Sequence, residues 1–188
     1  MTSPEILLAR HGETEWSRDL LHTGRTDVAL TDRGRGQAAA LGPRLAGREF
    51  AKVLASPLSR AVETCRLAGL GDRAELRPEL LELDYGEAEG LTTTQLRERD
   101  PGWTVWTHPI PGGETLDEVA TRLRPLVDEL GSSEGDVAIF AHGHILRVLA
   151  ALWIELPPQG GARLQLATGT LSTLGWERET RAIKRWNA

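Results

Sequence analysis

The sequence is poor in the features that build disulfides and membrane anchors. Its 188 residues include one cysteine, Cys65, and no hydrophobic run reaches 18 residues. A single cysteine excludes an internal disulfide, and short apolar runs argue against a membrane-spanning helix. No signal-peptide core precedes the first apolar run, so we expect a cytoplasmic protein. Cys65 lies on the apolar face of a predicted helix, where we interpret it as a core residue rather than a nucleophile.

The usual motifs for metals and nucleotides are also missing. The sequence has no pair of cysteines and no His-x-x-x-His, and of its five histidines only His142 and His144 are close together. Neither a P-loop nor a Gly-x-Gly-x-x-Gly motif is present. We therefore expect no metal site and no cofactor. The net charge of −5 disfavours nucleic acid or an anionic membrane as the main partner.

Hydrophobic patterning predicts that strands alternate with helices. Strands are expected over residues 6–9, 52–55, 74–77 and 137–141, with a terminal hairpin over 169–177 and 181–186. Helices are expected after caps at Thr31, Ser56-Pro57, Thr92 and Thr115, the last with a kink or break at Pro125, and over residues 145–154. This alternation implies one domain over residues 1–188, folded as a three-layer α/β/α sandwich with a largely parallel sheet.

The first strand ends in Arg10-His11-Gly12. Ligands bind at the carboxyl ends of strands in open α/β sheets. An arginine there can bind an anion, a histidine can act as a nucleophile, and a glycine lets the backbone approach a ligand closely. From these three residues alone, an anion site and a plain strand-to-loop turn both remain open.

Further motifs point to one protein family. It resembles the histidine phosphatase superfamily, also called phosphoglycerate-mutase-like, in four segments that follow in that family's order. These are Arg10-His11-Gly12-Glu13-Thr14 with Trp16, His22-Thr23-Gly24 and Leu30-Thr31-x-x-Gly34; Ser56-Pro57-Leu58-Ser59-Arg60-Ala61-x-x-Thr64; Leu81-Glu82-Leu83-Asp84-Tyr85-Gly86-x-x-x-Gly90; and Ala141-His142-Gly143. Within the family, the sequence is most similar to bacterial broad-specificity acid phosphatases and fungal sedoheptulose-1,7-bisphosphatases.

The resemblance implies roles for particular residues. His11 would attack the phosphoryl group and become a phosphohistidine, which water then hydrolyses. Arg10 and Arg60 would grip the phosphate bidentately and keep His11 neutral. His142 would donate to the phosphoryl oxygens, with His144 as a rival for that role.

Glu82 would protonate the leaving alcohol, and Glu79, Asp84 and Glu87 are its rivals. A carboxyl group must be protonated to donate, so we expect burial or a neighbouring anion to favour the neutral form of Glu82. The resemblance also implies substrate contacts, although the first two of these residues can equally be simple turn residues. They are Ser17, Thr23, Gly24 and Gly143.

Several loop residues have two open interpretations. An aromatic-rich set near the end of the sheet is either a small hydrophobic cluster under long loops or a lid that excludes water. Glu114 either belongs to the start of a helix or lies at the pocket rim. The aromatic-rich set is Trp16, His22, Tyr85, Trp103, Trp106 and His108.

The sequence therefore predicts a metal-independent phosphomonoesterase that hydrolyses sugar phosphates or other small phosphorylated metabolites through a phosphohistidine. A phosphoglycerate mutase-type phosphoryl transfer is an alternative, but it needs basic residues to hold a carboxylate, and residues 91–113 contain only Arg97 and Arg99. A non-catalytic phospholigand-binding module is a further alternative. A homodimer is expected from family analogy alone.

Overall fold

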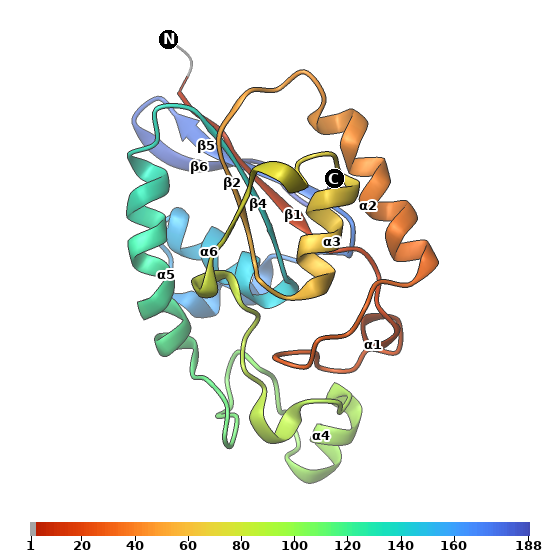
Figure 1. The fold of residues 1–188 in the computed structure, drawn as a ribbon. Coiled ribbons are helices and arrows are strands. Elements are labelled where there is room, and N and C mark those ends of the chain that lie inside the picture. Colours follow the sequence, from red (N-terminus) through yellow and green to blue (C-terminus); the bar gives the residue numbers. More distant parts are fainter. Residues whose placement is uncertain (1–2) are drawn as a thin grey trace.

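The computed structural model describes residues 3–188, and in that part of the chain it has one six-stranded sheet (Figure 1). The strands are β1 (Ile6–Arg10), β2 (Phe50–Ala55), β3 (Ala74–Leu76), β4 (Asp136–Ala141), β5 (Leu171–Glu177) and β6 (Thr180–Arg185). Their order is β3-β2-β4-β1-β5-β6. The first four strands in this order pair in parallel, whereas β5 is antiparallel to β1 and β6 to β5. The largely parallel sheet and the terminal hairpin are both confirmed.

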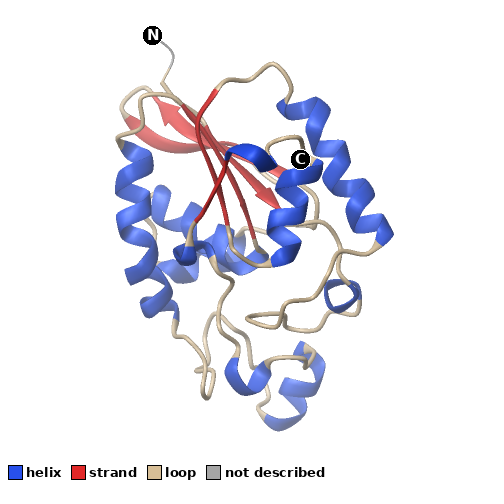
Figure 2. Ribbon diagram, in the orientation of Figure 1, coloured by secondary structure: helices blue, strands red, loops and turns tan. Residues whose placement is uncertain are grey.

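Helices cover both faces of this sheet, which confirms the three-layer sandwich (Figures 1 and 2). One face is covered by α2 (Asp32–Leu45) and α3 (Ser59–Leu67), and the other by α5 (Leu116–Gly131) and α6 (Gly143–Trp153). The strands are apolar throughout because both of their faces are buried. In β1, Ile6 and Leu8 belong to the core under α5 and α6, whereas Leu7 and Ala9 belong to the core under α2 and α3. Cys65 is fully buried in the second core, as expected.

Local capping explains where most helices begin. Thr31 accepts a hydrogen bond at the start of α2, and Thr92 and Thr115 each form a capping box at the start of α4 (Thr93–Arg99) and α5. Pro125 does not end α5, which continues through it. Across residues 3–188, every helix is too short or too polar to span a membrane.

The start of α3 differs from the expectation. The helix begins at Ser59, its N-cap is Leu58, and no side chain caps it. Ser56 is not the cap because its hydroxyl lies 2.7 Å from Nε2 of His142, 86 residues away in the sequence. The Ser56 hydroxyl also accepts from the backbone N–H of Leu58 over 3.4 Å, so it combines a local contact before α3 with a tertiary hydrogen bond.

Strands β1, β2 and β4 end at the same edge of the sheet, and the loops beyond that edge carry α1 (Glu15–Arg18) and α4 (Figure 1). The segment between β1 and α2 thus includes a short helix. Shorter 3₁₀ turns occur at Gly71–Arg73, Pro78–Leu80, Gly86–Ala88 and Pro158–Arg163. Arg10 pairs with Ala141 in the register of β1 and β4, so His11 and His142 emerge side by side.

Two glycines let the loop after β1 pass directly over the start of α2. A Cβ atom added to Gly12 would overlap the carbonyl of Gly34, and one added to Gly34 would overlap the carbonyl of Glu13. The two backbones are therefore in contact with no side chain between them. This crossing fixes the path of the chain immediately after His11.

Candidate active site

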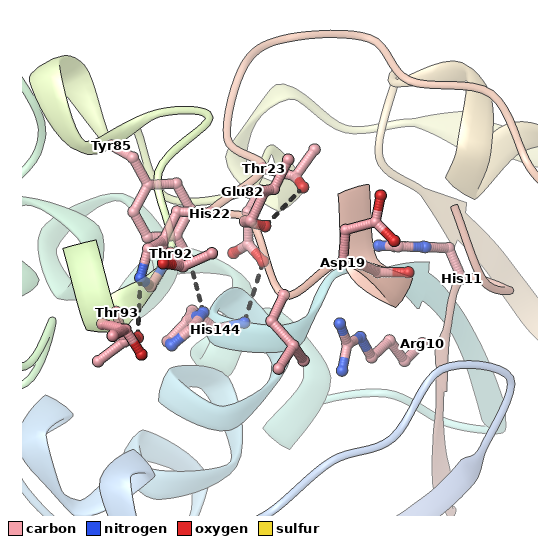
Figure 3. Close-up of a pocket in the computed structure, with 14 residues that line it drawn as sticks. Arg10, His11, Asp19, His22, Thr23, Glu82, Tyr85, Thr92, Thr93 and His144 are labelled. Carbon is pink, nitrogen blue, oxygen red and sulfur yellow. Dashed lines mark hydrogen bonds between the residues drawn. The ribbon is translucent and has the colours of Figure 1, made fainter. Parts of the chain in front are cut away.

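A cavity of about 390 Å³ lies at this edge of the sheet (Figure 3). Of the residues singled out in the sequence as catalytic or substrate-binding, it brings together Arg10, His11, Ser17, Thr23 and Glu82. The remaining lining residues are Asp19, Leu20, Leu21, His22, Tyr85, Thr92, Thr93, Thr94 and His144. The cavity lining does not include Arg60, His142, Gly24 or Gly143.

His11 is held in the form that a nucleophile needs. Its Nδ1 atom lies 2.7 Å from the carbonyl oxygen of Gly12, so Nδ1 carries the proton and Nε2 has a free electron pair. Burial, followed by the positive charges of Arg10 and Arg60, holds the pKa of His11 well below its ordinary value of 6.5. The ring is therefore neutral at neutral pH.

His142 lies behind His11, with 5.2 Å between the ring centroids. Nε of Arg60 donates to its Nδ1 over 3.1 Å, so the proton of the neutral ring is on Nε2. Nε2 donates this proton to the hydroxyl of Ser56 over 2.7 Å. Burial and the charge of Arg60 hold the pKa of His142 well below its ordinary value. Both nitrogens of this ring are thus already hydrogen-bonded to the protein.

The two arginines differ in what they offer to a phosphate. Arg10 uses one terminal nitrogen on the carbonyl of Leu166, and its buried Nε has no hydrogen-bond partner among the described residues. The Nε–Nη2 edge of its guanidinium is therefore available for a bidentate contact. All three nitrogens of Arg60 donate to the protein: Nε to His142, and the terminal pair to carbonyl oxygens of residues 23, 24 and 26. The structure thus presents one open guanidinium edge where two were expected.

The carboxyl group of Glu82 lies at the N-terminus of α6. Oε1 accepts from the backbone N–H groups of Leu83 (3.0 Å) and Ile145 (2.9 Å), and Oε2 accepts from that of His144 (3.0 Å). All three partners are donors, so both carboxyl oxygens of Glu82 act as hydrogen-bond acceptors at the N-terminus of α6. The rivals Glu79, Asp84 and Glu87 do not line the cavity.

The four expected substrate-binding residues occupy different places. Ser17 and Thr23 line the cavity, although the Ser17 hydroxyl also completes the capping box of α1 with Thr14. The backbone N–H of Gly24 donates to the carboxylate of Glu89 over 3.1 Å, so that donor is already in use. Gly143 is the first residue of α6, and a Cβ atom there would lie 3.2 Å from the guanidinium carbon of Arg10.

The aromatic-rich set forms a packed cluster that also supplies one wall of the cavity. The His22 ring lies 4.9 Å from Tyr85 and 5.3 Å from Trp103, and Trp106 lies 5.1 Å from His144. The hydroxyl of Tyr85 is 2.5 Å from Nδ1 of His144. Four members of the set thus pack together with His144, as the cluster interpretation expects.

Two members of the set lie elsewhere. Trp16 packs against Gly90, and His108 hydrogen-bonds to Thr107 within its own loop. Neither side chain lines the cavity.

Sequence reasoning missed the ion pair that holds the Glu82 loop. Glu114 accepts from Nε and Nη2 of Arg122 over 2.8 and 3.0 Å and from the backbone N–H of Asp84 over 3.0 Å. Arg122 also donates to the carbonyl oxygens of Glu79 and Glu82. Glu114 thus neither caps a helix nor lines the cavity beside His11, although it lines a second cavity next to Trp106. An arginine on an amphipathic helix gives no local sign of such a role.

Residues 3–188 contain no group of three or more His, Cys, Asp or Glu side chains that could hold a metal ion.

The profile of the histidine phosphatase superfamily (branch 1) matches residues 6–188. The chain belongs to this superfamily. It is an enzyme of that family, and phosphatases are among its relatives.

Known relatives cover most of the chain. A protein named acid phosphatase from Mycobacterium tuberculosis is 41% identical over 182 residues, which span 95% of this chain and 89% of that protein. Sedoheptulose 1,7-bisphosphatase from Saccharomyces cerevisiae is 32% identical, with coverage of 84% and 70%. A 2,3-bisphosphoglycerate-dependent phosphoglycerate mutase from Methylorubrum extorquens is 36% identical, with coverage of 87% and 85%.

The fold is shared with solved structures. The product of an open reading frame of Mycobacterium tuberculosis superimposes with a TM-score of 0.93 at 39% sequence identity, covering 98% of this chain and 97% of that one. The mostly parallel α/β sheet is thus that of the superfamily.

Proposed function

We propose that this chain is a metal-independent phosphomonoesterase that hydrolyses sugar phosphates or other small phosphorylated metabolites through a phosphohistidine on His11. The observation that carries the proposal is a shared cavity. The cavity is lined by His11, whose Nε2 is unprotonated, by Arg10, whose guanidinium has an open edge, and by Glu82 with its carboxyl group. These are the nucleophile, the anion clamp and the proton donor that phosphoryl transfer requires.

The proposed reaction has two steps. Arg10 binds the phosphoryl oxygens, Nε2 of His11 attacks phosphorus, and the bond from phosphorus to the ester oxygen breaks. Glu82 gives its proton to that oxygen, which leaves as an alcohol. Water then attacks the phosphohistidine, loses a proton to Glu82, and releases inorganic phosphate and neutral His11. The negative charge of a bound phosphate favours the protonated form of Glu82 that the first step needs.

Arg60 and His142 act from behind the nucleophile in this proposal. The positive charge of Arg60 helps to keep His11 neutral, and its Nε fixes the tautomer of His142. His142 donates from Nε2 to a phosphoryl oxygen, which requires exchange of its present bond to Ser56. Ser17 and Thr23 contribute substrate contacts from the cavity wall.

For Gly24 and Gly143, the proposed contribution to substrate binding is the absence of a side chain and not a direct contact with the substrate. A side chain at Gly24 would overlap the carbonyl of Leu83, and one at Gly143 would crowd Arg10.

The single-domain organisation, the cytoplasmic location and the homodimer stay predictions.

A mutase activity is the second candidate, because a phosphoglycerate mutase is among the relatives. A mutase must also hold the carboxylate of its substrate. Of the two bases available, Arg97 donates to the carbonyl oxygen of Trp103, and neither Arg97 nor Arg99 lines the cavity. This arrangement favours hydrolysis.

Initial rates on a panel of sugar monophosphates and bisphosphates, measured in EDTA, test the proposal. We expect phosphate release, an acid-labile phosphoprotein after a rapid quench, and loss of both in His11→Ala. His108→Ala is the matched control, because that ring lies outside the cavity. Isomer formation without phosphate release would establish the mutase instead. Tight phosphate binding without any turnover would indicate a non-catalytic module.

A further inference from the structure

Charge is distributed unevenly along the cavity wall. Three of the lining side chains belong to Asp, Glu, Lys or Arg, namely Arg10, Asp19 and Glu82. Arg10 and Glu82 belong to the proposed phosphate end, and Asp19, the C-cap of α1, which pairs with Arg18 at 3.0 Å, lies beside Arg10 and His11 in Figure 3. In the same view, Tyr85, His22, Thr93 and His144 lie on the other side of Glu82 from Arg10 and His11. Beyond the phosphate end, the described lining therefore has no Asp, Glu, Lys or Arg side chain.

Three arginines on the neighbouring segments already have partners. Arg147 on α6 stacks over the ring of Trp106 at 4.5 Å and donates to two backbone carbonyls. Arg97 on α4 donates to a backbone carbonyl over 3.0 Å. Arg25, which follows the cavity residue Thr23, pairs with a glutamate at 3.3 Å. These three guanidinium groups are thus engaged by other parts of the protein, and none of them lines the cavity.

The far wall is instead neutral and polar. His144 pairs with the Tyr85 hydroxyl through Nδ1, and His22 with the Thr93 hydroxyl through Nε2 at 3.2 Å. Burial lowers the pKa of both histidines, so their rings are neutral at neutral pH. The second nitrogen of each ring has no partner among residues 3–188, and the Thr94 hydroxyl also lines this wall. Hydroxyl and imidazole groups can donate to and accept from the hydroxyls of an alcohol, whereas phosphates and carboxylates only accept.

We infer that this cavity selects phosphate monoesters whose leaving alcohol carries hydroxyl groups and no second negative charge. The inference rests on the proposed phosphatase activity and narrows it. At this wall, the second anionic group of a bisphosphate or a phosphorylated acid would lose its hydration water and gain contacts to neutral groups alone. Sugar monophosphates and polyol phosphates are the chemical class that fits.

Matched pairs of substrates test the inference directly. Glycerol 3-phosphate and 3-phosphoglycerate differ only in a hydroxymethyl group against a carboxylate, and sorbitol 6-phosphate with 6-phosphogluconate gives a second such pair. Fructose 6-phosphate and fructose 1,6-bisphosphate compare one phosphate with two. We expect kcat/KM at neutral pH to be lower by about tenfold or more for the charged member of each pair.

A charge variant identifies the cause of the selection. Thr94→Lys places a cation at an exposed position of the cavity wall, in the first turn of α4. It should reduce the ratio of kcat/KM between the two members of each pair by about threefold or more, mainly by lowering KM for the charged member. Thr180→Lys adds the same charge at an exposed position on β6, away from the cavity, and should leave the ratio unchanged. Melting temperatures confirm that both variants fold.

The outcomes separate this inference from the proposed function. Equal or faster hydrolysis of the charged members, abolished by His11→Ala, would overturn the selectivity while the phosphatase activity stands. If the ratio of kcat/KM within each pair is unchanged in a folded Thr94→Lys variant, the absence of a cation from the cavity wall does not cause the selectivity. If no member of any pair releases phosphate in a His11-dependent way, the proposed function itself is wrong.

Discussion

Glutamine at position 82 should affect stability as well as catalysis. Glu82 accepts three backbone hydrogen bonds, two through Oε1 from Leu83 and Ile145 and one through Oε2 from His144. The amide oxygen of glutamine can replace Oε1, but the amide nitrogen would then face the N–H of His144. Both groups are donors, so no hydrogen bond can form between them. One charge-assisted hydrogen bond is lost and two become neutral. Since hydrogen bonds to charged groups contribute about 1.5–3 kcal/mol each, we expect Glu82→Gln to lower the free energy of unfolding by about 2–4 kcal/mol.

The same change removes the proposed acid. An alkyl phosphate leaves as a poor alkoxide and needs a proton, whereas p-nitrophenolate leaves with little help. Phosphorylation of His11 by a sugar phosphate should therefore slow by about 10²–10⁴-fold in Glu82→Gln, and that by p-nitrophenyl phosphate much less. Burst kinetics isolate this step from hydrolysis of the phosphohistidine, in which Glu82 acts as a base.

Urea denaturation at neutral pH measures the stability of Glu82→Gln beside that of Glu87→Gln. Glu87 is exposed in the same loop, so its substitution should change neither stability nor rate. Unaltered stability of Glu82→Gln would refute the contact between its carboxylate and α6. Equal slowing of the phosphorylation step for both substrates would remove Glu82 from the acid role and direct attention to Asp84.

The same reasoning predicts three further outcomes. Arg60→Ala removes a charge that lowers the pKa of His11, so the acid limb of the kcat/KM profile should move to higher pH and the rate fall by about 10²–10³-fold; full activity with an unmoved limb would make Arg60 structural. Arg122→Lys keeps the charge but not the planar contacts to the Glu82 loop, so steady-state rates should fall more for alkyl phosphates than for p-nitrophenyl phosphate; equal losses would contradict a positioning role. Because the pKa values of His11, His142 and His144 lie below 6.5 in the folded protein, the unfolded chain binds more protons below that pH. The free energy of unfolding should therefore decrease as pH falls below 6.5, by up to about 1.4 kcal/mol per pH unit for each histidine; urea denaturation from about pH 7 to 5 would contradict this if it were flat.

Much of the fold could be predicted because its determinants are local. The apolar runs of β1 and β4 indicate strands buried on both faces, and Thr92 and Thr115 with their acceptors three residues later mark helix starts. Strand ends then predict where Arg10 and His142 meet.

The remaining features depend on contacts between distant segments. Ser56 has the sequence context of a cap, but its partner is a histidine 86 residues away. Glu82 could be identified from its motif, although the α6 amides that surround it, 62 and 63 residues further on, have no sequence signature. Arg60 illustrates the same limit, since backbone carbonyls that occupy a guanidinium leave no trace in side-chain patterns.

The crossing of Gly12 and Gly34 limits how this enzyme can be re-engineered. Each glycine faces a backbone carbonyl, which no substitution can shorten, so a mutation at one position cannot be compensated by a mutation at the other. Directed-evolution libraries that randomise either position would consist mostly of misfolded variants. Diversity is better placed in α4, where the exposed Thr94 borders the cavity without supporting the chain after His11. The chain after the nucleophile thus tolerates no side chain at these two glycines, and changes of substrate have to come from the opposite wall.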